Sequence, residues 1–117
     1  MVQTPNDGLR TLIQELRLAA AKDQAPIWKR IAQDLERPTR ERRAVNLSRI
    51  NRFTKENETV IVPGKVLSVG ELDHKVTIAA FRFSRVAKDK INKSGAALTI
   101  KELLQKHPPA KDLRIIG

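Results

Sequence analysis

The sequence predicts an α/β fold in a single domain, with a helical hairpin at the N-terminus. Two proline-opened segments with apolar residues at helical spacing come first, and short β-branched runs that alternate with capped helical segments follow. A length of 117 residues allows one domain with a modest core. We therefore expect residues 1–37 to form the hairpin, 38–44 a basic loop and 45–117 a mixed β/α core.

The first helix is expected to begin at Pro5 and to end near Lys22. Thr4 is a suitable N-cap, and Asp7 follows it by three residues, as in a capping box. The apolar stripe that follows has helical spacing and comprises Leu9, Leu12, Ile13, Leu16, Ala19 and Ala20.

The second helix is expected to begin at Pro26. Pro38 cannot continue a helix, so the segment should end near Glu36 or Arg37. Its apolar face comprises Ile27, Trp28, Ile31, Ala32 and Leu35. Together the two segments predict a helical hairpin.

The later sequence contains four strand candidates. They are "VNLS" (45–48), the β-branched run "TVIVPGKVLSVG" (59–70), "HKVTIAAFRF" (74–83) and the terminal "LRIIG" (113–117). "RINRFT" (49–54) is a possible helical turn, and Gly70–Asp73 a turn or short loop. In the longest run, Pro63 blocks a ladder hydrogen bond and Gly64 permits a bend.

Two short helices are expected between the later strands. Ser84 is the N-cap of the first, and Gly95 is expected to end it in the left-handed conformation. Thr99 and Glu102 form a capping box for the second, with Pro108 as its stop. The residues expected inside from the first of these helices are Val86, Ala87 and Ile91.

The charge predicts a polyanionic partner. Lys and Arg number 23 against 13 acidic residues, giving a formal net charge of +10 and a pI near 10.6. Nucleic acid is the first candidate and an anionic membrane surface the second, but no run approaches the roughly 18 apolar residues of a spanning helix. The N-terminus also lacks a signal-peptide pattern, so we expect a cytoplasmic protein. With no cysteine, thiolate chemistry and cysteine-ligated metal sites are excluded.

An arginine-rich stretch between residues 37 and 53 is the first candidate for contacts with phosphate. The guanidinium group can bond phosphate oxygens in a bidentate manner, which favours arginine at such sites. The competing interpretation is a solvated face whose arginines pair with Glu36 and Glu41. The candidate contacts are Arg37, Arg40, Arg42, Arg43, Arg49 and Arg52.

A second basic cluster lies between residues 74 and 93. Arg85, Lys88 and Lys93 could share one exposed helix face, and a helix that merely keeps its solvent side charged is an equally good interpretation. The cluster comprises Lys75, Arg82, Arg85, Lys88, Lys90 and Lys93.

Few aromatic residues are available for base stacking. The chain has one Trp, three Phe and no Tyr, and Trp28, Phe81 and Phe83 have the patterns of core residues. Binding should therefore depend on backbone and shape, as in recognition of structured RNA, with little reading of sequence.

No catalytic, metal or cofactor site is predicted. Glu71, Asp73 and His74 could supply ligands, but the only other histidine, His107, lies beyond another helix. Residues 63–66 contain a Gly-Lys pair without the other residues of a phosphate-cradling loop, so Gly64 is better explained as a bend that lets Lys65 approach an anion. We expect no enzyme, no cofactor and no small-molecule substrate.

Several segments together resemble one family. They are "VNLSRINRF", "VIVPGKVLSVGELDHKVTIAAFRFS", "KINKSGAALTIKELL", the terminal "LRIIG" and the "W--IA--L-RP" pattern from Trp28 to Pro38. The chain resembles, over nearly its whole length, the eighteen-e family of large-ribosomal-subunit proteins of archaea and eukaryotes, relatives of the bacterial large-subunit protein fifteen. Ser68 and Ala96 stand where the family pattern has glycine.

The resemblance implies a structural, non-enzymatic protein that binds and braces folded rRNA, with an irregular superhelical core of β-β-α units. It implies large-subunit rRNA and neighbouring ribosomal proteins as partners, a ribosome-associated location in the cytoplasm and, from the short length, an archaeal source. The alternative function is a non-ribosomal nucleic-acid-binding regulator. The recurrent polar positions of the family, to which RNA contact is carried over, are Arg40, Arg43, Asn46, Lys65, His74 and Lys75.

Overall fold

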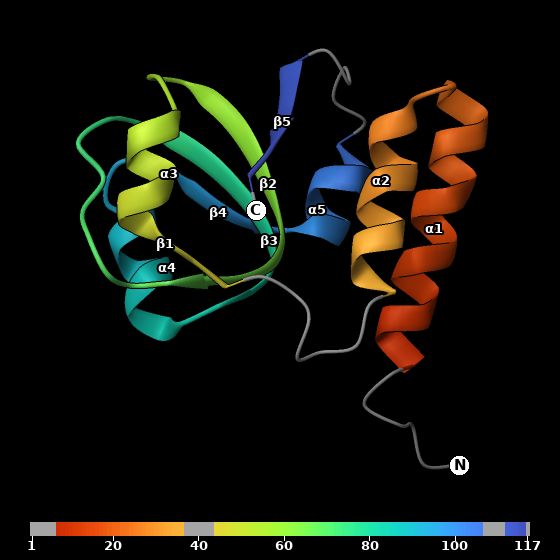
Figure 1. The fold of residues 1–117 in the computed structure, drawn as a ribbon, viewed down its shortest axis with the longest axis horizontal. Coiled ribbons are helices and arrows are strands. Elements are labelled where there is room, and N and C mark those ends of the chain that lie inside the picture. The colour runs from red at the N-terminus through yellow and green to blue at the C-terminus, as the bar shows by residue number, and fades with distance from the viewer. Residues whose placement is uncertain (1–6, 37–43, 107–111, 117) are drawn as a thin grey trace. The chain divides into compact units, whose positions relative to one another are not determined.

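The computed structural model describes residues 7–36, 44–106 and 112–116. These residues fall into two compact units, a hairpin unit within residues 1–42 and a core unit within 43–117. The first is helical and the second has a parallel β-sheet with helices (Figure 1). The predicted α/β class with an N-terminal helical hairpin is confirmed, while the proposed boundaries at residues 37 and 44 stay predictions.

The hairpin unit consists of α1 (Asp7–Asp23) packed against α2 (Pro26–Leu35). The chain reverses at Gln24, whose φ is +50°. The cap predicted at Thr4 and Pro5 lies outside the described residues. The apolar faces meet as expected, because both helices bury residues of the predicted stripes: Leu12, Leu16, Trp28, Ile31, Ala32 and Leu35.

The core unit contains five described strands, all paired in parallel. They are β1 (Ala44–Asn46), β2 (Glu58–Leu67), β3 (Val76–Phe83), β4 (Ala96–Thr99) and β5 (Leu113–Ile115). The order is β1-β2-β3-β4, and β5 also pairs with β2. The strand expected over 45–48 ends at Asn46, because Leu47 and Ser48 already belong to a helix.

The Pro63-Gly64 step divides β2 into two halves with different partners. One edge of β2 pairs with β3 along nearly its whole length, with a register shift between Val62 and Lys65. The other edge therefore has to accept both remaining partners: β5 pairs with residues 59–61 and β1 with residues 65–67. The predicted interruption at this step is a β-bulge at which β2 exchanges one neighbour for another.

Three helices complete the core unit: α3 (Leu47–Phe53), α4 (Arg85–Asn92) and α5 (Ile100–Gln105). Two predicted caps are confirmed. Ser84 Oγ accepts a hydrogen bond from Ala87 N at 3.2 Å, and Thr99 forms the capping box with Glu102.

The prediction of a left-handed Gly95 is wrong. Gly70 is the described glycine with positive φ, and the C-cap of α4, Lys93, is right-handed. The lack of a side chain at Gly95 matters for another reason, because a Cβ there would lie 2.1 Å from the carbonyl oxygen of Val76.

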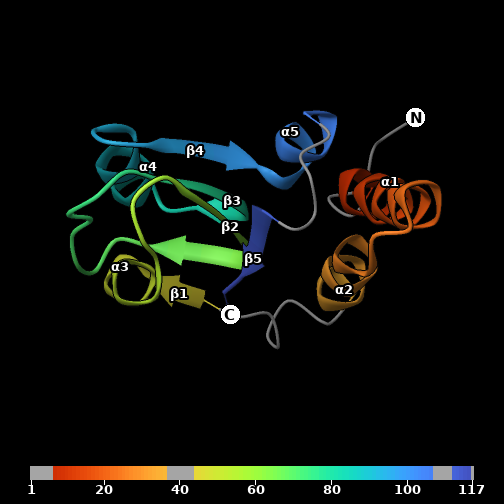
Figure 2. The ribbon, with the colours of Figure 1, turned by 90° about the horizontal axis from the view of Figure 1, so that it is seen from above.

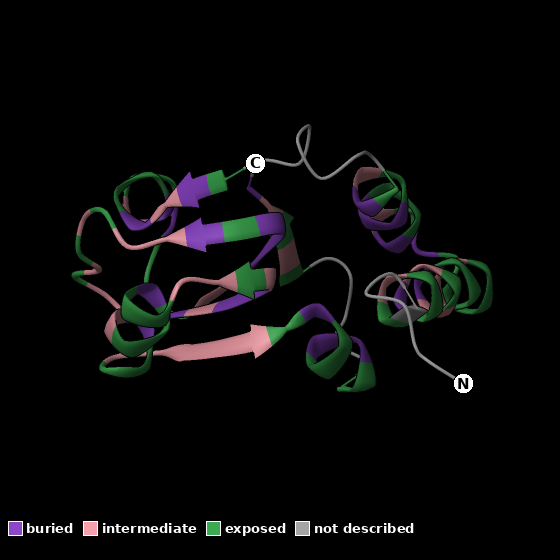
Figure 3. Cartoon of the chain, turned by 90° about the horizontal axis from the view of Figure 1, so that it is seen from below, coloured by how far each residue is buried: buried purple, intermediate pink, exposed green. Residues whose placement is uncertain are grey.

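The core unit buries one face of its sheet under α3 and α4, which lie on the same side (Figures 1 and 2). Most residues of β2 and half of those of β3 are buried, whereas β4 is mostly intermediate (Figure 3). Ala87 and Ile91 point inward as predicted, but Val86 is 52% exposed, so its predicted burial is wrong. The hydrophobic cluster between the sheet and these two helices comprises Val45, Leu47, Ile50, Val60, Val62, Val66, Val76, Ile78, Ala80, Ala87, Ile91 and Ile116.

The connection between β2 and β3 is unusually short for parallel strands. Val76 at the start of β3 lies level with Glu58 at the start of β2, so residues 68–75 must return along the length of β2. Parallel connections generally need about a dozen residues or more, so eight residues are few for this return. We call residues 68–75 the crossover segment. Hydrogen bonds tie it to α3: Ser48 N donates to Val69 O at 3.0 Å, and Asp73 N donates to Asn51 Oδ1 at 3.1 Å.

Candidate nucleic-acid interface

Four of the predicted contacts, Arg37, Arg40, Arg42 and Arg43, lie outside the described residues. The other predicted contacts all belong to the core unit. The structure distributes them over β1, α3, the ends of β2 and β3, α4 with its C-cap, and the crossover segment.

On α3, the two predicted arginines are exposed. Leu47 and Ile50 face the core with no exposed area, which leaves Arg49 and Arg52 on the outer face of the helix. The guanidinium carbon of Arg49 lies 5.2 Å from the centroid of the Phe53 ring. Asn46 precedes the helix, and its Oδ1 accepts a long hydrogen bond of 3.4 Å from Val69 N.

At the carboxyl end of the sheet, Lys65 of β2 and Arg82 of β3 are register partners. Partners on adjacent strands point to the same face, and both side chains are exposed there. Arg85 follows β3 directly, at the start of α4, and Ser84 N is tied to Val66 O at 2.9 Å. Val66 and Phe83, the next residues of the two strands, belong to the core that α3 and α4 cover, so Lys65 and Arg82 lie together on the opposite face of the sheet.

On α4, the predicted shared face is confirmed. Arg85, Lys88 and Lys93 are exposed on the side opposite the buried Ala87 and Ile91. Lys93 is the C-cap of α4, eight positions after Arg85, which corresponds to about 12 Å at 1.5 Å per residue.

Lys90, in contrast, makes its polar contacts within the protein. Its side chain is 24% exposed, and its Nζ lies 3.0 Å from each of three oxygens: Ser68 O, Gly70 O and Glu71 Oε1. Lys90 therefore fastens the start of the crossover segment to α4. Its charge is used within the protein.

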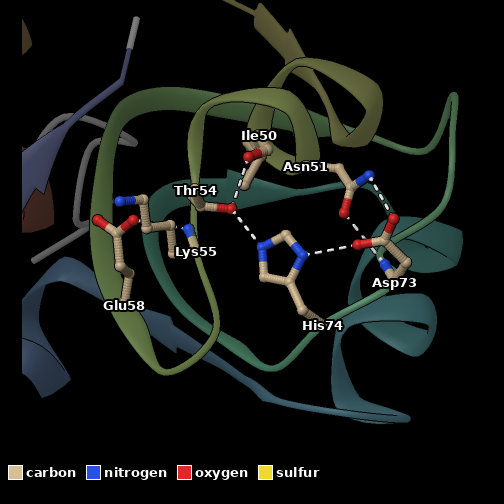
Figure 4. Close-up of polar contacts among 7 residues, drawn as sticks. All are labelled: Ile50, Asn51, Thr54, Lys55, Glu58, Asp73 and His74. Carbon is tan, nitrogen blue, oxygen red and sulfur yellow. Dashed lines mark hydrogen bonds and ion pairs between the residues drawn. The ribbon is translucent and has the colours of Figure 1, made fainter.

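His74 also makes contacts within the protein (Figure 4). Its side chain is 15% exposed; Nδ1 lies 2.7 Å from Asp73 Oδ1, and Nε2 lies 2.7 Å from Thr54 Oγ1. The Thr54 hydroxyl is also 2.7 Å from Ile50 O. A hydroxyl has one proton, so if it donates to that carbonyl, the ring must donate from both nitrogens as imidazolium. In the neutral ring, Nε2 accepts the hydroxyl proton and Nδ1 still donates to Asp73.

The hydrogen bond from His74 is the main cause that lowers the pKa of Asp73 below its ordinary value of 3.8, and the hydrogen bond from Asn51 lowers it further. Asn51 is the partner of Asp73 on α3, with Nδ2 3.3 Å from Asp73 Oδ2. His74 and Asp73 thus join the end of the crossover segment to α3 and its C-cap. Lys75, the next residue, is exposed.

Most of the predicted contacts on β2, β3 and α4 form no ion pair with a carboxylate in the part of the chain that the structure describes. There, the cations that pair with carboxylates are Arg17, Arg30, Lys90 and Arg114, with the His74–Asp73 contact in addition. Glu36, considered as a partner for the arginine stretch, pairs with Arg17. The predicted contacts on these three elements and at the C-cap of α4 that form no ion pair are Lys65, Arg82, Arg85, Lys88 and Lys93.

Other classes of site find little support within residues 7–36, 44–106 and 112–116. In these ranges no group of His, Asp and Glu has the geometry to hold a metal ion. No helix in the same ranges is long and apolar enough to cross a membrane.

Sequence reasoning missed two exposed residues beside α3. No position on a surface is predicted for Phe53, and its side chain is 48% exposed. Arg114 lies on β5, and its Nη1 donates to Phe53 O at 2.5 Å. The signal for Phe53 was its place after Arg49 by four residues, the spacing at which helical side chains meet. No local signal connects Arg114 with a helix 61 residues earlier.

The family described as "Ribosomal protein 60S L18 and 50S L18e" matches residues 2–116. The chain belongs to this family. The predicted resemblance is thereby confirmed, and so are the predictions of a ribosomal protein and of a non-enzymatic role. The alternative of a non-ribosomal regulator receives no support.

Archaeal relatives match over nearly their whole length. "Large ribosomal subunit protein eL18" of Methanothermobacter thermautotrophicus is 48% identical over 112 residues, which cover 95% of this chain and 93% of the relative. The protein of the same name from Methanoregula boonei is 44% identical over 116 residues, covering 98% and 96%. That from Sulfurisphaera tokodaii is 41% identical over 106 residues, covering 90% of each.

Proposed function

We propose that this protein is a structural constituent of the large ribosomal subunit, where it binds and braces folded rRNA through the basic surface of its core unit. Family membership and a net charge of +10 support this role. Its partners are then large-subunit rRNA and neighbouring large-subunit proteins, and its location is the ribosome in the cytoplasm.

The observation that carries the proposal is the set of five exposed cations with no described ion-pair partner, Lys65, Arg82, Arg85, Lys88 and Lys93. Their backbones belong to β2, β3, α4 and the C-cap of α4, which the core holds in place. Cations of this kind replace the counterions of phosphate groups and let phosphate strands approach each other. Bracing of RNA by charge neutralisation requires no chemistry.

The remaining predicted contacts differ in the observations that support them. Arg49, Arg52 and Lys75 are exposed and are included. Arg37, Arg40, Arg42 and Arg43 are included on the sequence argument alone. Asn46 is included as a weaker contact, since its side chain also bonds Val69 N. His74 is left out because both of its ring nitrogens have partners in the protein.

The test is the salt dependence of binding to purified large-subunit rRNA. The double variant Lys88→Gln/Lys93→Gln removes two charges from the proposed surface, so the slope of log K against log salt should become shallower by about 1.4–1.8, at roughly 0.7–0.9 per phosphate contact. Lys101→Gln/Lys106→Gln is the matched control, because it removes the same charge from exposed positions on and just after α5. Equal slopes for the two double variants would contradict the placement of the surface.

A further inference from the structure

A hollow of about 410 Å³ lies between the end of α3 and β5. Its volume falls within the range of roughly 300–1,000 Å³ found for small-molecule sites. Apolar and cationic groups line it together: Arg49, Phe53, Arg114, Ile115 and Ile116.

Phe53 gives the hollow an aromatic wall. Phe53 is 48% exposed and is the aromatic residue among the large exposed apolar side chains of the described core unit, which also include Val69 and Val86. The Arg49 guanidinium carbon is 5.2 Å from the ring centroid, so a planar cation and an aromatic ring lie together at the surface. Such groups are the surfaces on which unstacked bases stack.

Arg114 connects the wall to the sheet. Its Nη1 donates to Phe53 O at 2.5 Å and lies 3.7 Å from Glu58 Oε2. β5 in turn pairs with β2, and Ile116 N donates to Ile61 O at 3.0 Å. The guanidinium has five N–H donors, so these contacts leave it able to bond an anion. The hollow therefore has a flat π surface, an apolar floor and cations at its rim.

We propose that this hollow binds one unpaired nucleotide of RNA, with its base against Phe53 and Arg49 and its phosphate toward Arg114. An apolar peptide would suit the floor but not the two guanidinium groups, whereas a nucleotide uses both features. The inference rests on the proposed function in that the ligand is RNA. It adds a stacking contact to a surface that otherwise binds through charge.

The probes are two RNAs: a nine-nucleotide oligouridine with 2-aminopurine at its centre, and a blunt twelve-base-pair duplex. The wild-type chain should quench the 2-aminopurine fluorescence as it binds the single strand. Phe53→Ala should bind the single strand about 5- to 150-fold more weakly, the effect of losing one base–aromatic stack, and should not quench. Its duplex affinity and salt slope should be unchanged, because no charge is removed.

Three variants separate the loss of an aromatic ring from the loss of apolar bulk. Phe53→Trp should restore affinity and quenching, while Phe53→Leu should not, since leucine keeps bulk without a π face. Val86→Ala removes a comparably exposed apolar side chain from α4 and should behave as wild type. Because Phe53 is half exposed, all variants should fold, which a denaturant titration would verify.

The outcomes separate this inference from the proposed function. Single-strand affinity of Phe53→Ala equal to that of wild type would overturn the inference, and so would an equal loss for both RNAs. If Phe53→Ala binds RNA normally but leaves the large subunit, the hollow belongs to a protein neighbour and the inference also fails. Failure of the wild-type chain to bind either RNA would instead contradict the proposed function.

Discussion

Replacing Gly70 with alanine should destabilise the core unit, because the crossover segment passes α3 at this residue with no room for a side chain. The φ of Gly70 is +101°, and a Cβ would lie 2.5 Å from Ser48 N and 2.6 Å from Ser48 Cβ. These atoms belong to the first turn of α3, whose neighbours Leu47 and Ile50 are fully buried. The segment is also held on its other side, because Lys90 Nζ of α4 donates to Gly70 O at 3.0 Å.

The expected loss of unfolding free energy is about 2–6 kcal/mol. Backbone strain at positive φ costs a residue with a side chain about 1–3 kcal/mol. Displacement of the segment also weakens two hydrogen bonds, from Ser48 N to Val69 O and from Val69 N to Asn46 Oδ1, at about 0.5–1.5 kcal/mol each. A domain of this size has roughly 5–15 kcal/mol in total, so the effect is large.

The assay is urea unfolding followed by circular dichroism, with Trp28 fluorescence recorded in parallel. Trp28 is the sole tryptophan and lies in the hairpin unit, so its signal reports on the other part of the chain. Gly8→Ala is the control, since no atom lies within 4 Å of a Cβ at Gly8 in α1 and alanine favours helix by up to about 1 kcal/mol. A Gly70→Ala midpoint equal to that of wild type would refute the reasoning.

Three further predictions concern the polar contacts of the core unit. Thr99→Ala removes the bond from Glu102 N to Thr99 Oγ1, 3.0 Å long, and should cost about 0.5–2 kcal/mol in urea unfolding, whereas Thr99→Ser should cost less. Lys90→Met leaves two crossover carbonyls without their 3.0 Å donor; it should cost about 1–3 kcal/mol and should speed amide exchange in the crossover segment, and unchanged exchange would count against the anchor. The pKa of Asp73 is lowered in the folded chain by its bond with His74, so its stabilising effect is complete above pH 3.8 and is lost as the pH falls through the folded-state pKa. Asp73→Asn should therefore flatten that part of the acid-unfolding curve, and parallel curves for variant and wild type would contradict the assignment.

Local signals in the sequence predicted most of the elements. The caps at Ser84 and Thr99 depend on hydrogen bonds to residues three positions later, so the residue types alone indicate them. The interruption at Pro63-Gly64 follows from backbone properties of those two residues. Such signals need no knowledge of the rest of the fold.

Elements that depend on distant partners were missed or misjudged. β4 has no strong strand pattern, and it forms because Ala96–Thr99 pair with Thr77–Ala80 of β3. At Gly95 the sequence suggested a conformational reason for glycine, whereas the actual reason is the approach of the Val76 carbonyl from another strand. A turn signal does not show which strand will lie beside it.

The candidate site shows the same division. Exposure of Arg85, Lys88 and Lys93 follows from helical periodicity, which the sequence displays. The internal role of His74 depends on Thr54, 20 residues earlier, and that of Lys90 on carbonyls of the crossover segment. A histidine or lysine contributes to a surface only when no such partner is near, and residue type alone cannot decide that.

The central claim is that the basic surface of the core unit holds this protein in the large ribosomal subunit. The most direct measurement is sedimentation of tagged wild-type chain, Lys88→Gln/Lys93→Gln and Lys101→Gln/Lys106→Gln through gradients of native lysate across a salt series. Wild type and the Lys101/Lys106 control should remain with the large subunit, while the Lys88/Lys93 variant should dissociate at lower salt. Wild-type chain at the top of the gradient at low salt would contradict the ribosomal role, and equal retention of both variants would contradict the surface assigned to it.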